Sequence, residues 1–369
     1  MKAAVPYASL LFLVVCSNFA LVGCGEAPKA PQQNVPDVRL EIPAPPAAAR
    51  YIYERTLHGS SDLGSKPGKS ALLKFLDGRG EETSNLGEGL SKPYAVAAHH
   101  GRVYVSNTVD RHVSVFDIEN KRFFTIGADG AGVLRKPMGL SVDSVGNLFV
   151  ADAMTNFILV FDRDGRYLRS IGGPKWFSHL TSVTADPKGD RIYGVDSGSP
   201  SLEDHRVRVF DPVGGRHLFD FGTRGSAPGK LNVPYDLAVG KAGRLYVVDS
   251  GNFRVQIFDH DGKYLKSFGT AGKRPGQFSR PKEIAADADG NVYVVDAMLG
   301  NFQVFDPDGV FLFAAGSHGE DGATLKYMLP SGIGIDEDGR IYFVDQWYGK
   351  MDIFRPVHRT LGQESKKKQ

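Results

Sequence analysis

The chain contains 369 residues, of which 41% are hydrophobic and 23% charged, so it can form a sizeable core and is not intrinsically disordered. Glycine is frequent, with 44 residues, which favours a fold with many tight turns. Lysine and arginine outnumber aspartate and glutamate by only 44 − 42 = 2, and this near-neutral balance disfavours nucleic acid as a partner.

The first residues have the organisation of an export signal. A lysine at position 2 gives a positive start, an apolar stretch follows at residues 10–15, and small residues precede Cys24. Residues 21–24, Leu-Val-Gly-Cys, resemble the bacterial lipobox, in which cleavage precedes a cysteine that then receives a diacylglycerol. The resemblance implies a signal peptide over residues 1–23 and lipid attachment at Cys24. The open alternative is an ordinary signal peptide with a chance cysteine.

Residues 24–49 are rich in proline and alanine and contain no aromatic residue. Such a segment cannot form a core and favours extended conformations, with a reach of roughly 75 Å for about 25 residues. We therefore expect a tether between a membrane-inserted lipid and a folded body at residues 50–357, followed by a polar basic tail at 358–369. Gly25 after the cysteine, by resemblance to the usual enterobacterial sorting rule, favours the bacterial outer membrane, facing the periplasm.

A repeated unit fills the folded body. Its six copies begin at Pro93, Pro137, Leu180, Pro234, Pro281 and Pro330. In each copy an aromatic-aliphatic strand ends in a small polar or acidic residue: Asn107, Asp152, Asp196, Asp249, Asp296 and Asp345. A phenylalanine follows nine residues later in five copies (for example 258 − 249 = 9) and fourteen residues later in the third (210 − 196 = 14). Register kept this closely indicates one structural unit that occurs six times.

Short alternating strands with Gly-containing turns, repeating about every 40–50 residues, are typical of four-stranded propeller blades. The sequence therefore predicts an all-β, six-bladed β-propeller. The last copy has no obvious fourth strand, and residues 51–58 resemble the fourth strand of the other copies. We expect this N-terminal strand to complete the last blade and close the ring. Residues 59–92 are then a long insertion, with a candidate helix at 71–76.

Three segments resemble NHL repeats: residues 276–281 (Gly-Gln-Phe-Ser-Arg-Pro), 246–249 (Tyr-Val-Val-Asp) and 254–259 (Arg-Val-Gln-Ile-Phe-Asp). The resemblance covers about residues 51–356. It implies that the aspartate after the second strand and a following arginine support blade packing, as Asp249 with Arg254 and Asp196 with Arg206. NHL propellers include protein-binding platforms, RNA-binding domains, sensor domains and a few lyases.

A catalytic metal site has only weak candidates. Residues 85–90, Asn-Leu-Gly-Glu-Gly-Leu, resemble a segment of gluconolactonase-type propellers whose glutamate binds a divalent metal in the central channel. The resemblance makes Glu88 a weak metal candidate, with Asp236 the nearest second ligand, and the rest of the ligand set has no match. The Asp-x-Asp-Gly segments lack the spacing of a calcium loop and are typical of hairpin turns. The ten histidines, scattered rather than repeated at one position as a zinc lyase would need, are expected on the surface.

One group of residues does recur at equivalent positions. Immediately before the first strand of each copy stand Lys92, Lys136, His179, Val233, Arg280 and Leu329. In a four-stranded meander this position shares a face with the loops between the second and third strands, so basic residues surround one channel mouth. Lys282, Trp176 and Trp347 are expected nearby, as is the loop at 197–205, which is five residues longer than its counterparts (14 − 9). This field suits an anionic or sugar-like ligand, whereas the alternative is a set of solvated cations.

These observations favour a non-catalytic, lipid-anchored binding or scaffold propeller in the bacterial cell envelope. Its expected partners are the membrane, through Cys24, and a protein or glycan on the face with the basic residues, without a cofactor and without nucleic acid. The alternative is a metal-dependent lactonase-like or lyase-like enzyme with its site in the central channel.

Overall fold

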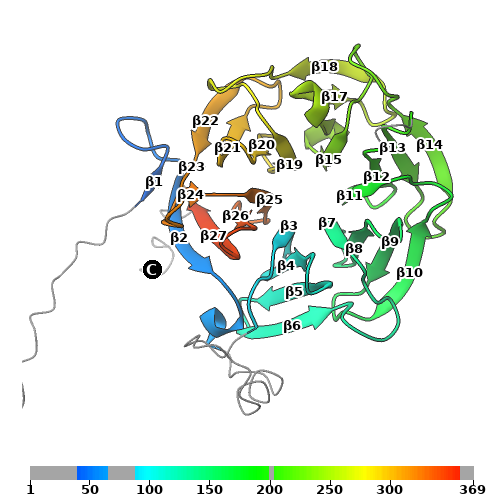
Figure 1. The fold of residues 1–369 in the computed structure, drawn as a ribbon, viewed down its shortest axis with the longest axis horizontal. Helices are drawn as coiled ribbons and strands as arrows, with labels where there is room; N and C mark the ends of the chain where they lie inside the picture. Colours follow the sequence, from blue (N-terminus) through cyan, green and yellow to red (C-terminus); the bar gives the residue numbers. More distant parts are fainter. Residues whose placement is uncertain (1–39, 65–87, 199–202, 358–369) are drawn as a thin grey trace, which may run out of the picture. The chain divides into compact units, whose positions relative to one another are not determined.

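In the computed structural model, residues 40–64, 88–198 and 203–357 are described. Their strands form six sheets arranged in a ring around a central axis, as Figure 1 shows, and one further sheet of two short strands. The prediction of an all-β, six-bladed β-propeller is confirmed. Cys24, the candidate helix at 71–76 and the tail at 358–369 lie outside the described residues.

Blades 1 to 3 each run outward from the channel in chain order. Blade 1 consists of β3 (Pro93–His99), β4 (Arg102–Asn107), β5 (His112–Asp117) and β6 (Arg122–Ile126). Blade 2 consists of β7 (Pro137–Val142), β8 (Leu148–Asp152), β9 (Phe157–Phe161) and β10 (Tyr167–Gly172). Blade 3 consists of β11 (Leu180–Ala185), β12 (Ile192–Asp196), β13 (Arg206–Phe210) and β14 (His217–Phe221).

Blades 4 to 6 continue the pattern. Blade 4 consists of β15 (Pro234–Val239), β16 (Leu245–Asp249), β17 (Arg254–Phe258) and β18 (Tyr264–Phe268). Blade 5 consists of β19 (Pro281–Ala286), β20 (Val292–Asp296), β21 (Asn301–Phe305) and β22 (Phe311–Ala315). Blade 6 consists of β25 (Pro330–Ile335), β26 (Ile341–Asp345), β27 (Lys350–Pro356), β2 (Tyr51–Leu57) and β1 (Glu41–Ile42). The short elements between them are η1 (Ser60–Leu63), η2 (Lys241–Gly243), η3 (Ser250–Asn252), β23 (Ser317–His318) and β24 (Lys326–Tyr327).

The N-terminal strand closes the ring as predicted. β2 pairs antiparallel with β27, from Tyr51 opposite Pro356 to Leu57 opposite Met351. β1 then adds a fifth strand to the blade, and Ile42 is buried in the same core cluster as Tyr51. The segment expected to be a tether as far as residue 49 therefore contacts the propeller from residue 40 onwards. A strand of only two residues has no period that sequence patterning can detect.

Each hydrophobic core lies between two blades. The cluster between blades 4 and 5, for example, joins Tyr246 and Val248 of β16 to Phe278, Ile284 and Phe305. The five residues of β16 are all buried, whereas β18 at the rim alternates between exposed and half-buried positions. Inner strands therefore read as continuous apolar runs because both of their faces are covered.

The Asp-x-Asp-Gly segments are hairpin turns, as predicted, and they also connect neighbouring blades. In the turn of blade 5, Asp306 Oδ1 accepts hydrogen bonds from the backbone N–H groups of Asp308 (2.9 Å) and Val310 (2.8 Å). Asp308 pairs with Arg244 of blade 4 at 3.1 Å. The same inter-blade pair recurs as Arg102–Asp164 and Arg191–Asp261. Arg340 of blade 6 instead pairs with Glu54 of its own blade at 3.2 Å, so this pair does not bridge the blade 6–blade 1 boundary.

The aspartate–arginine pairs implied by the NHL resemblance are found in one blade and altered in another. Arg254 Nε donates to Asp249 Oδ2 at 2.8 Å, as expected. Arg206 does not pair with Asp196: it contacts Asp204 at 3.1 Å. Asp204 belongs to the longer loop of blade 3 (residues 197–205), which brings a closer carboxylate to Arg206.

Among the described residues, no helix is long and apolar enough to cross a membrane.

Candidate functional site

Buried aspartates fix the turns between the second and third strands. In blade 5, Asp296 Oδ1 accepts hydrogen bonds from the N–H groups of Met298 (3.1 Å) and Leu299 (3.0 Å). Its Oδ2 accepts one from Ser279 in the connection that enters the blade (2.7 Å). Asp296 is fully buried, so the turn cannot rearrange without leaving a carboxylate unsatisfied. The Met298 side chain projects from this fixed turn and is 58% exposed.

Other blades present an apolar side chain at the same position, two residues after the buried polar residue. These side chains are Val109 (56% exposed), Met154 (63%) and Trp347 (67%). Phe253 and Val233, both 37% exposed, lie in the same set of turns and entering connections. Because strands alternate in direction, all these segments lie on one face of the ring, which we call the loop face. Exposed methionine and aromatic side chains gathered on one face are characteristic of interaction surfaces.

The predicted basic residues lie on the loop face or on the adjacent channel wall. Lys92, Lys136 and Arg280 are exposed. His179 is half-buried, its Nδ1 lies 2.6 Å from Ser197 Oγ, and burial together with the charge of Lys136 lowers its pKa. Lys282 is buried, with Nζ 5.4 Å from the centre of the Tyr94 ring. Burial and, after it, the charge of Arg280 lower the pKa of Lys282 to about 8.

Two residues expected on the surface are packed instead. Trp176 stacks on His217 of β14, the outermost strand of blade 3, with ring centres 4.2 Å apart, so it lies away from the channel mouth. His205 is only 2% exposed, and its Nδ1 accepts a hydrogen bond from the N–H of Val233 at 3.0 Å. The expectation of surface histidines is therefore wrong for His205, because the C-terminal end of the blade 3 insertion docks onto the entry to blade 4.

Two carboxylates line the channel, a cavity of about 250 Å³ bordered by the innermost strands of all six blades. Asp236 accepts hydrogen bonds from Ser182 Oγ (2.6 Å) and from the N–H of Ile284 (3.0 Å), which links blades 3, 4 and 5. Glu283 Oε2 accepts one from the N–H of Ile333 (3.2 Å), and its Oε1 is buried with no hydrogen-bond partner among the described residues. Burial raises the pKa of Asp236 to about 6. Burial and, after it, the charge of Asp236 raise the pKa of Glu283 well above its ordinary value.

The structure does not bring the two weak metal candidates together. Asp236 lines the channel, where both of its oxygens are already hydrogen-bonded. Glu88 is exposed, its backbone N–H donates a hydrogen bond to Ser60 Oγ, and its C=O accepts one from the N–H of Ser60, the first residue of η1. Sequence reasoning missed Glu283, although it occupies in blade 5 the position that Asp236 occupies in blade 4, two residues after the first proline of the blade.

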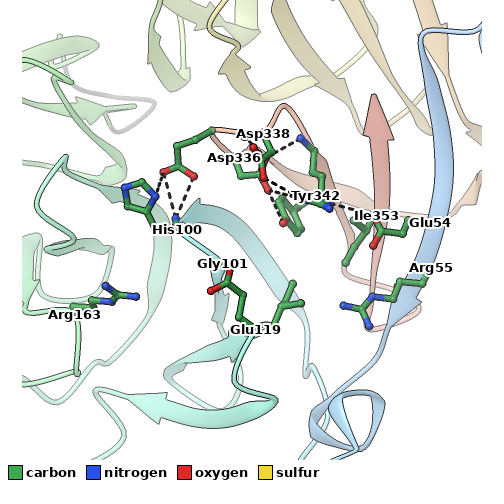
Figure 2. A pocket seen from close by; sticks show the side chains of 13 residues that line it. Glu54, Arg55, His100, Gly101, Glu119, Arg163, Asp336, Asp338, Tyr342 and Ile353 are labelled. Atoms are coloured by element: carbon green, nitrogen blue, oxygen red, sulfur yellow. Dashed lines mark hydrogen bonds and ion pairs between the residues drawn. The ribbon is translucent and has the colours of Figure 1, made fainter. Parts of the chain in front are cut away.

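The opposite mouth of the channel opens on the hairpin face, which carries the turns between first and second and between third and fourth strands. A cavity of about 580 Å³ lies there, lined by the inner hairpins of all six blades. A second cavity, of about 480 Å³, lies at the blade 6–blade 1 boundary, shown in Figure 2. His100 and Glu337 line both cavities. Neither cavity was anticipated, because the residues that line them come from hairpins far apart in the chain.

Comparison with known proteins agrees with this architecture. A family model described as a 6-bladed beta-propeller matches residues 232–312. Human NHL repeat-containing protein 3 is 33% identical over 88 residues, which are 24% of this chain and 24% of that protein. Protein lin-41 of Caenorhabditis elegans is 41% identical over 68 residues, which are 18% of this chain and 6% of lin-41. The matches therefore span about a quarter or less of these curated relatives.

Three solved structures share the fold. A Bacteroides thetaiotaomicron protein of unknown function aligns with TM-score 0.58 and 19% identity, over 75% of this chain and 72% of that one. A gluconolactonase of Xanthomonas campestris aligns with TM-score 0.54 and 17% identity, over 72% and 87% of the two chains. A streptogramin B lyase aligns with TM-score 0.51 and 16% identity, over 72% and 94%. Such identities show the fold alone. The chain is an NHL-repeat-like six-bladed β-propeller.

Proposed function

We propose that this protein is a non-catalytic, lipid-anchored propeller of the bacterial cell envelope that binds a protein partner through its loop face. The observation that carries the proposal is the set of exposed apolar side chains that buried aspartates hold on that face, Met154, Met298 and Trp347 foremost. Methionine, tryptophan and arginine are enriched in protein interfaces, and a pre-fixed surface loses little conformational entropy on binding.

The charges around these side chains define the chemistry of the partner. Lys92, Lys136 and Arg280 are exposed on the same loop face. A partner that presents apolar side chains flanked by carboxylates would match both features. The cations would accelerate encounter and fix orientation, while the apolar contacts would supply most of the affinity.

The proposed lipid on Cys24 would hold the propeller at a membrane, and Gly25 favours the outer membrane, facing the periplasm. The tether then spans the residues between Cys24 and β1, because β1 already belongs to blade 6. An anchored propeller with a free loop face could bind partners too broad for a closed pocket.

The proposal is tested by capture from envelope extract with two matched double variants. Met298→Ser/Trp347→Ser removes apolar contacts from the loop face. The control Val145→Ser/Val213→Ser removes apolar side chains that are even more exposed (76% and 79%) from the hairpin face. We expect the first variant to lose the partner and the second to retain it, with unchanged thermal unfolding for both. Equal capture by both variants would place the binding site elsewhere.

A further inference from the structure

Two adjacent imidazoles lie at the tip of the inner hairpin of blade 1. Neighbouring residues of a strand normally point to opposite faces. His100 has a φ of +44° and Gly101 a φ of +74°, so they form a two-residue turn with both positions in the left-handed region. The turn brings the ring of His100 back towards His99, with ring centres 4.2 Å apart.

A carboxylate from blade 6 faces these imidazoles. Glu337 Oε1 lies 2.8 Å from His99 Nδ1 and 3.9 Å from His100 Nδ1. Asp336 fixes the hairpin that carries Glu337, because its Oδ1 accepts the N–H groups of Asp338 (2.9 Å) and Arg340 (2.8 Å). The backbone N–H of His100 also donates a hydrogen bond to Glu337 Oε2 (3.1 Å), so this carboxylate contacts both histidines.

We propose that His99, His100 and Glu337 bind a transition-metal ion of the zinc type across the blade 6–blade 1 boundary. Two imidazoles and one carboxylate are a donor set that zinc accepts, and their ligand atoms all lie within 4.8 Å of one another. Bonds of about 2.0–2.2 Å in a tetrahedral site need donor spacings of about 3.3–3.5 Å. The spacings from Glu337 Oε1 to His99 Nδ1 (2.8 Å) and to His100 Nδ1 (3.9 Å) lie on either side of this range, and the side chains of His100 (63% exposed) and Glu337 (45%) are open to solvent.

Three protein ligands leave a fourth position for a small molecule. His100 and Glu337 line the cavities of about 580 and 480 Å³, so an ion between them borders both. Figure 2 shows Arg55 and Arg163 on the walls of the smaller cavity. Glu54, Glu119 and Asp338 line the same cavity, so its walls carry charges of both signs, and a small polar ligand could bind the ion while it forms hydrogen bonds to these side chains. The site is independent of the loop face, so either proposal can fail without the other.

The experiment measures binding of zinc alone to the full-length chain by calorimetry, and of cobalt alone by its visible absorption. The test variants are His100→Asn, because asparagine tolerates a left-handed φ, and Glu337→Gln. The control is His260→Gln, which alters a similar group at another blade boundary, where His260 Nε2 lies 2.8 Å from Asp186.

We expect one equivalent of zinc on the wild type, at least about tenfold weaker binding in both test variants, and unchanged binding in His260→Gln. The cobalt complex of the wild type should show the strong visible bands of a tetrahedral site. A wild type that binds no zinc stoichiometrically, or test variants that bind it as tightly as the wild type, would overturn the proposal.

Discussion

The channel carboxylate Asp236 makes a quantitative prediction about stability and pH. Its pKa in the folded protein is about 6, against an ordinary value of 3.8, and the cause is burial. The pKa of Asp236 is higher in the folded protein than in the unfolded chain. Protonated Asp236 therefore makes its full contribution to the free energy of unfolding below pH 4, and this contribution is lost as the pH rises through 6. The difference of about 2 pKa units corresponds to about 3 kcal/mol between pH 4 and pH 8.

The substitution Asp236→Asn should abolish this loss. The Oδ1 atom of the new asparagine can accept a hydrogen bond from the N–H of Ile284, and its Nδ2 can donate one to Ser182 Oγ, so both inter-blade contacts persist. We expect the variant to match the wild type at pH 4 and to exceed it by up to about 3 kcal/mol at pH 8, a rise in Tm on the order of 5 °C. Urea and thermal unfolding followed by circular dichroism at both pH values measure the difference, with exposed Asp289→Asn as control. A variant that is less stable than the wild type at pH 8 would refute the reasoning. Free energies of unfolding that differ between the variant and the wild type by the same amount at both pH values would also refute it.

Two further predictions concern the N-terminal segment. Deleting residues 50–57 removes β2, in which Tyr51, Ile52 and Leu57 are buried. We therefore expect the free energy of unfolding to fall by several kcal/mol and little soluble protein to be obtained. A truncated chain with an unchanged melting temperature would contradict closure by β2. The substitution Cys24→Ser should abolish incorporation of labelled fatty acid and release the propeller from the membrane fraction, and labelling that persists would rule out lipid attachment at this residue.

The fold could be predicted because its landmarks recur in register. Each buried aspartate, such as Asp249 or Asp296, ends the second strand of its blade and accepts a hydrogen bond from the connection that enters the same blade. The aspartate therefore occurs at a fixed position of the repeat, which makes the blade recognisable in the sequence. Details set by a single blade could not be predicted in this way. Trp176 could not be placed, because an aromatic residue in a connection fits either a channel mouth or an inter-blade core.

The candidate site was predicted only in part, for a related reason. The basic residues were found because they precede the first strand of several copies. Methionine also recurs two residues after the aspartate, as Met154 and Met298, and this pattern could have been detected in the sequence. The exposure of these two side chains could not have been predicted, since methionine is usually buried. The contact of His99 with Glu337 joins residues 238 positions apart and follows only from ring closure.

The pairing of β2 with β27 also has a consequence for how the chain reaches its native state. Hydrogen-bonded neighbours inside a blade are separated by few residues, so blades 1 to 5 can form from local contacts as they emerge. The strand at Tyr51–Leu57, in contrast, is synthesised first and finds its partner, Lys350–Pro356, last. Until then both carry unpaired backbone edges that could join another chain. Assembly of this propeller therefore ends in one long-range step, and exchange of β2 between two copies is the error to which that step is most exposed.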